Sequence, residues 1–225
     1  MRIVYMGTPD IAVPTLRFLA ESKHEVVGVL TQPDRPKGRG HHTIPTPVKA
    51  AALEYDIPVY QPLSLRKGED AAAALETLRQ LAPDLIVVLA YGQLLPKEVL
   101  ELPKYGCINL HVSLLPKYRG SAPVQWSVLN GDAETGVSGV TVHQTAAGSY
   151  TGYMLAKKEI AIGAEETAEE LYERLSELCV ETLSETLEQL EAGTLQGTPQ
   201  DDAQSSYASR ITNEMSALAF TPPAA

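Results

Sequence analysis

Residues 106–116 read GCINLHVSLLP and form the most informative stretch of this chain. The apolar run over residues 107–111 predicts a buried strand that carries two polar side chains, Asn109 and His111. Side chains two positions apart on a strand lie on the same face, so we expect both to project together at its end. An amide beside an imidazole can polarise a carbonyl group and move a proton. A strand-end cap next to a hydrogen-bonded histidine accounts equally well for this spacing.

Further apolar runs before and after this stretch predict a layered fold. Strands are expected over residues 2–6, 25–31, 57–60, 84–89 and 107–111, and then over 137–143 and 153–162. Helices are expected over residues 12–20, 48–55, 69–81, 123–129 and 167–190. This alternation predicts an α/β protein with a doubly wound, mostly parallel, Rossmann-like sheet. The last two strands are expected to be antiparallel, and the long leucine-spaced helix closes the fold.

Composition limits the classes of function. The 225 residues suit one large domain, and a hydrophobic content of 44% can fill its core. A formal charge of −10 argues against a general nucleic-acid binder, because phosphate contacts need clustered Lys and Arg. Two cysteines, Cys107 and Cys179, provide no disulfide framework. Without a signal peptide or a long apolar run, we expect a cytoplasmic monomer with no membrane contact.

Four stretches, each placed after an expected strand or at its end, identify a resemblance. They are MGTPD at 6–10, QPDRPKGRG at 32–40, VLAYGQLLP at 88–96 and NLHVSLLPKYRGSAP at 109–123. Together they resemble the folate-dependent formyltransferases, and among these the members that act on methionyl-tRNA. The resemblance implies transfer of a formyl group from 10-formyltetrahydrofolate to the amino group of initiator methionyl-tRNA. It also implies a catalytic domain over residues 1–192, followed over residues 193–225 by a linker or tail toward a C-terminal domain.

The resemblance assigns roles to residues of this chain. Asn109 would hydrogen-bond the formyl oxygen, and His111 would stabilise the developing negative charge. The folate pocket would be lined by Val88, Leu89, Ala90, Tyr91, Gly92, Ser113, Leu114, Leu115 and Pro116. The loop that meets tRNA would carry Arg35, Lys37, Arg39, His41 and His42. The two histidines stand where the family usually has lysines, so we expect weaker phosphate contact, and a solvated loop without a partner is the alternative.

The third catalytic group departs from the family pattern. The family has an aspartate here, and Tyr150 occupies its place in the stretch SYTGYML at 149–155. No Asp or Glu lies between Glu134 and Glu159, so a small shift of alignment does not restore a carboxylate. A neutral phenol cannot replace a carboxylate as the partner of an imidazolium. We therefore expect formyl transfer by this chain to be severely impaired.

Two other interpretations fit the altered pocket. In one, the scaffold has been engineered or repurposed as a ligand-binding domain. In the other, His143 and Ser149 form the base and nucleophile of a designed hydrolase, with Tyr153 as a further polar group. The histidines lack the spacing of metal ligands, so we expect no metal.

Overall fold

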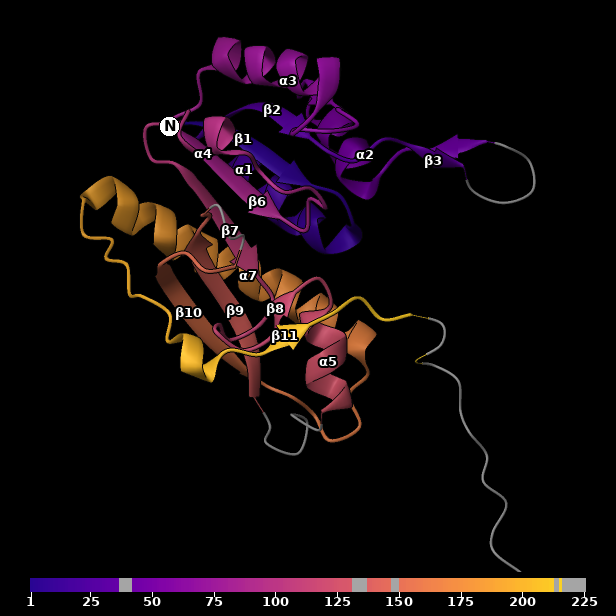
Figure 1. Ribbon diagram of the computed structural model, residues 1–225, viewed down its shortest axis with the longest axis vertical. Helices are drawn as coiled ribbons and strands as arrows, with labels where there is room; N and C mark the ends of the chain where they lie inside the picture. The colour runs from indigo at the N-terminus through magenta and orange to yellow at the C-terminus, as the bar shows by residue number, and fades with distance from the viewer. Residues whose placement is uncertain (37–41, 131–136, 147–149, 213–214, 216–225) are drawn as a thin grey trace, which may run out of the picture.

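The computed structural model contains one sheet of seven strands with helices on both faces (Figure 1). It describes residues 1–36, 42–130, 137–146, 150–212 and 215, with the backbone alone for 137–143. The strands follow the order β10-β9-β7-β6-β1-β2-β5 across the sheet. Their bounds are β1 Arg2–Gly7, β2 Glu25–Leu30, β5 Val59–Tyr60, β6 Leu85–Leu89, β7 Cys107–His111, β9 Val137–Gln144 and β10 Met154–Ala161.

The sheet is parallel from β7 to β5 and antiparallel at its other edge. All five residues of β6 are buried, because helices cover both faces of the parallel strands. Strand β9 pairs antiparallel with both β7 and β10. The predicted doubly wound, mostly parallel sheet with antiparallel strands near its C-terminal end is therefore confirmed.

Alternate residues of β1 point to opposite faces of the sheet and pack into two separate hydrophobic cores. Ile3 and Tyr5 pack with the helices of one face, whereas Val4 and Met6 pack with those of the other. On the first face lie α1 Val13–Glu21, α2 Pro47–Glu54, α5 Pro123–Leu129 and α7 Ala168–Ala192, and on the second lie α3 Gly68–Leu81 and α4 Lys97–Leu100. The described residues also form two 3-10 turns, η1 Asp10–Ala12 and η2 Asp202–Gln204.

Helix α7 has well-formed ends and a buried stripe. Thr167 accepts a hydrogen bond from the Glu170 backbone, and the Glu170 carboxylate accepts one from the Thr167 backbone. This capping box satisfies donors that a helix start leaves open. Gly193 ends the helix at a φ of +70°, the left-handed conformation that favours glycine. The buried leucines of the stripe are Leu171, Leu175, Leu183 and Leu187.

Short elements depart from the sequence prediction. The loop expected around residues 35–42 includes part of a small antiparallel pair, β3 Arg35–Pro36 with β4 Thr43–Ile44. Helix α4 and strand β8 Arg119–Gly120 were not predicted either. Elements of two to four residues carry too little periodicity to be seen in sequence, and tertiary contacts decide them.

The described residues after α7 pack against the domain. Strand β11 Tyr207–Ala208 pairs parallel with β8, and Thr198 bridges Met154 of β10. The Trp126 indole donates to the Ser209 carbonyl at 2.7 Å. A boundary after residue 192 stays a prediction, but residues 198–209 are ordered on the surface of the fold. In the described part of the chain, no helix is both long and apolar enough to cross a membrane.

Candidate active site

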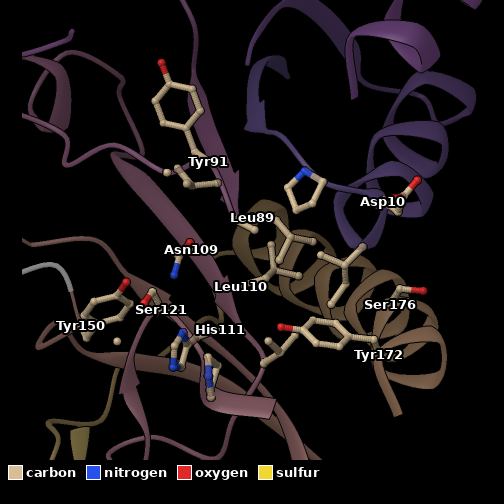
Figure 2. A pocket seen from close by; sticks show the side chains of 18 of the residues that line it. Asp10, Leu89, Tyr91, Asn109, Leu110, His111, Ser121, Tyr150, Tyr172 and Ser176 are labelled. Atoms are coloured by element: carbon tan, nitrogen blue, oxygen red, sulfur yellow. The ribbon is translucent and has the colours of Figure 1, made fainter. Parts of the chain in front are cut away.

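A pocket of about 1070 Å³ lies where β6 and β7 end, beside the turn after β1. Parallel α/β sheets bind ligands at this edge because the loops that follow the strands diverge there. Figure 2 shows that side chains from β7, from the loop after β6 and from α7 surround the pocket. Its size is that of a site for a drug-sized molecule.

The end of β6 and the loop that follows it form one wall of the pocket. Val88, Leu89, Ala90, Tyr91 and Gly92, all expected from the sequence, line it. Ala90 and Gly92 have φ values of +50° and +93°, so the chain turns sharply and presents its backbone to the pocket. The Tyr91 ring points away from Asn109 and His111 into the second core (Figure 2). Burial raises the pKa of the Tyr91 phenol, which has no hydrogen-bond partner among the described residues.

Asn109 and His111 both line the pocket, as their spacing on β7 predicts. His111 is 5% exposed, and its Nε2 lies 2.7 Å from the carbonyl oxygen of Tyr118. A carbonyl only accepts, so Nε2 must carry the proton, and a change in protonation must take place at Nδ1. The contact also holds the imidazole in one orientation within the pocket wall.

Tyr150 lies directly beside His111. The two ring centroids are 5.1 Å apart with the planes inclined by 57° (Figure 2). Burial, with a smaller contribution from Tyr207, raises the pKa of Tyr150, so the phenol is neutral near pH 7. The position at which the resemblance expects a carboxylate therefore holds an aromatic ring that carries no charge.

The far end of the pocket was not expected from the sequence. Tyr172 and Ser176 of α7 lie there, with Gln125 of α5, and the Tyr172 hydroxyl donates to Gln125 at 3.3 Å. Asp10, Glu169 and Glu173 also line the pocket, whereas no described Lys or Arg does. These residues come from three separate elements, so only the tertiary structure could assemble them. The one sequence signal was MGTPD at 6–10, which follows the first strand.

Residues 113–116, expected to line the folate pocket, do not line this one. The Ser113 hydroxyl donates to the Lys117 carbonyl at 2.7 Å, and Leu115 is fully buried. The Lys157 ammonium donates to the Leu115 carbonyl at 2.8 Å, and the bond from Leu115 to Pro116 is cis. The pocket is therefore lined by residues 88–92 but not by Ser113, Leu114, Leu115 and Pro116, although the sequence predicted both sets together. Their role toward folate stays a prediction.

The remaining expected residues lie elsewhere. Arg35 of β3 is exposed, as is His42, which directly precedes β4, while Lys37, Arg39 and His41 lie outside the described residues. Ser149 also lies outside them, and His143 is placed only by its backbone, opposite Asn109 in the β7–β9 register. Tyr153 is 53% exposed and does not line the pocket. Among the described residues, no group of three His, Cys, Asp or Glu side chains could hold a metal ion.

Comparison with known proteins places this geometry in a family. The formyl transferase family matches residues 1–187. The methionyl-tRNA formyltransferase of Geobacter sulfurreducens is 51% identical over 214 residues, which cover 95% of this chain and 65% of that protein. Its counterpart in Alkaliphilus oremlandii is 47% identical over 224 residues, covering 100% of this chain and 70% of that protein. The chain thus spans about two thirds of the length of these relatives.

Solved structures share the fold. Glycinamide ribonucleotide transformylase 1 from Symbiobacterium toebii superposes with a TM-score of 0.71 at 19% identity, covering 89% of this chain and 94% of that one. The N-formyltransferase from Helicobacter canadensis gives 0.69 at 21% identity, covering 92% of this chain and 70% of that one. At these identities the likeness concerns the fold alone. From the match over residues 1–187 and the close relatives, we conclude that the chain belongs to the formyl transferase family.

Proposed function

We propose that the chain is a formyl-transfer domain, with 10-formyltetrahydrofolate as donor and the amino group of initiator methionyl-tRNA as acceptor. The observation that supports this most directly is the joint placement of Asn109 and His111 in a pocket at the carboxyl ends of the strands. The names of the close relatives give the acceptor. We expect the isolated chain to be monomeric, with weakened tRNA contact through residues 35–42.

The residues present fit a folate-sized donor. A pocket of about 1070 Å³ with apolar walls accommodates a large, flat ligand. The backbone turns at Ala90 and Gly92 leave peptide groups facing the pocket for polar contacts with a heterocycle. The bound donor supplies the formyl group. Val88, Leu89 and Ala90 would contribute the wall that holds it.

In this proposal, two side chains of β7 carry out the formyl transfer. The Asn109 amide would donate to the formyl oxygen, where negative charge develops as the amine attacks. The His111 ring, held through Nε2 by the Tyr118 carbonyl, would exchange a proton at Nδ1. A carboxylate beside the imidazole would stabilise its charged form, but the neighbouring Tyr150 is a neutral phenol. We therefore propose that the chain retains the donor site and transfers the formyl group slowly.

Calorimetric titration with 5-formyltetrahydrofolate, a stable analogue of the donor, tests the site. Ser121 is exposed and lines the pocket near His111, so Ser121→Trp should fill this space without disturbing the core. We expect the original chain to bind and the tryptophan variant to lose binding. The exposed Ser205 does not line the pocket, so Ser205→Trp is the matched control. Absence of binding by the original chain would contradict the proposal and favour a repurposed pocket.

A further inference from the structure

Three segments far apart in the sequence meet at the side chain of Gln200. The Arg119 guanidinium of β8 donates to Gln200 Oε1 twice, from Nε at 3.1 Å and from Nη2 at 2.8 Å. Gln200 Nε2 donates to the carbonyl of Tyr150 at 2.6 Å and to the carbonyl of Gly152 at 2.9 Å. One amide therefore links the strand after β7, the loop before β10 and the segment after α7.

The chemistry of its partners determines how this amide is oriented. A guanidinium only donates and a carbonyl only accepts, so the amide oxygen must face Arg119 and its nitrogen the loop. Both lone pairs of the oxygen and both N–H groups of the amide are used. Arg119 itself is anchored, with its side chain 13% exposed and in an ion pair of 2.7 Å with Asp202. Glutamine is the side chain of this length that can satisfy both sides at once.

The loop with Tyr150 and Gly152, to which Gln200 donates, packs tightly against the end of β9. A Cβ at Gly152 would lie 1.7 Å from the Gln144 carbonyl oxygen, so the two backbones are in direct contact there. The backbone N–H of Gln144 donates to the Tyr153 carbonyl at 2.9 Å. Tyr150 is the first described residue of this loop, and its carbonyl is one of the two that Gln200 binds.

The same segment after α7 also supports the partner of Tyr150. The Tyr118 amide donates to the Ser206 hydroxyl at 2.9 Å, and the Tyr118 carbonyl lies against His111 Nε2. Residues 200–206 thus contact the backbone that bears Tyr150 and the backbone that orients His111. Both members of the His111–Tyr150 ring pair are therefore connected to this segment through backbone hydrogen bonds.

We propose that Gln200 is a positioning residue, which holds the Tyr150 backbone so that residue 150 lies against His111 in the pocket. The inference rests on the proposed function for its importance to catalysis, but its geometry can be tested without turnover. Gln200 is not among the residues that line the pocket. Its effect would reach the reacting atoms only through residue 150.

The test is the NMR resonance of the His111 ring proton, which senses the ring current of Tyr150 at 5.1 Å. The variant Tyr150→Leu defines the shift that follows loss of this ring. Gln200→Glu should move the resonance in the same direction, because a carboxylate keeps the pairing with Arg119 but repels the two carbonyls. Gln200→Met, an uncharged side chain of similar length, should do the same. Asp202→Asn removes only the charge of the exposed partner of Arg119 and should leave the His111 resonance unchanged.

The outcomes are distinguishable from failure of the proposed function. If a Gln200 variant folds with the original circular dichroism and keeps the original His111 resonance, the inference is wrong. Unfolding of both Gln200 variants would also overturn it, since the amide would then support the whole fold rather than one loop. A chain that does not bind 5-formyltetrahydrofolate but still shows the expected shifts would contradict the function while leaving the positioning role intact.

Discussion

Replacing Tyr150 with aspartate should restore rapid formyl transfer. The change removes a neutral ring next to His111 and places a carboxylate on the same backbone position, still held by Gln200. Aspartate is smaller than tyrosine, so the half-buried site accommodates it without overpacking. A negative charge there would stabilise the imidazolium that forms as the amine loses its proton.

The size of the gain follows from the geometry. Two unit charges 5.1 Å apart, the separation of the His111 and Tyr150 ring centroids, attract by about 3 kcal/mol at an effective dielectric constant of about 20. An energy of this size in the transition state corresponds to a factor of about 10² in rate. Proton-transferring groups contribute typically about 10²–10⁴ in enzymes. We therefore expect the single-turnover rate constant of Tyr150→Asp to exceed that of the original chain by about 10².

Single-turnover transfer of a labelled formyl group to initiator methionyl-tRNA measures this directly. Tyr150→Asn is the matched control, because it has the shape of aspartate without the charge and should give no comparable gain. Affinity for 5-formyltetrahydrofolate should be similar in all three chains. Equal rates for the aspartate and asparagine variants, or a rate in the original chain as high as that of Tyr150→Asp, would refute the electrostatic reasoning.

Three further predictions concern stability. Gly152→Ala should lower the free energy of unfolding by about 3 kcal/mol in urea titration, because its Cβ would collide with the Gln144 carbonyl oxygen. Gly193→Ala is the control, since its Cβ would meet open space, and it should lower this free energy by about 1 kcal/mol. Burial and then the N-terminal ammonium lower the pKa of His24, so the folded chain resists a proton that the unfolded chain accepts below about pH 6.5. Stability should therefore fall between about pH 7.5 and about pH 5.5 and fall less in His24→Gln. Leu183→Ala, at a fully buried position of α7, should cost about 2–5 kcal/mol by calorimetric or urea unfolding.

The regular elements were predictable because their patterns are local. The bounds expected for β7 from the run at 107–111 agree with the structure, and the helix expected over 167–190 is α7 at Ala168–Ala192. The joint projection of Asn109 and His111 followed from the two-residue repeat of a strand. Each of these predictions needed only the sequence within one element.

The elements that were missed depend on distant partners. Strand β8 exists because β11 lies beside it, some ninety residues later in the chain. The contact between the His111 and Tyr150 rings joins β7 to a loop that precedes β10. No pattern within either stretch carries information about such a pair, since it arises only when separate segments pack.

That Tyr150 stands at the position of a family carboxylate rests on the resemblance and stays a prediction. The α/β class and the joint placement of Asn109 and His111 were predictable from the chain alone. These are properties of residue order and of local periodicity. Three features came from the packing of distant segments: Tyr150 lies against His111, α7 lines the far end of the pocket, and Gln200 donates to the Tyr150 carbonyl. The physical reason is that pockets and hydrogen-bond networks form between segments whose separation in the chain is unrelated to their distance in space.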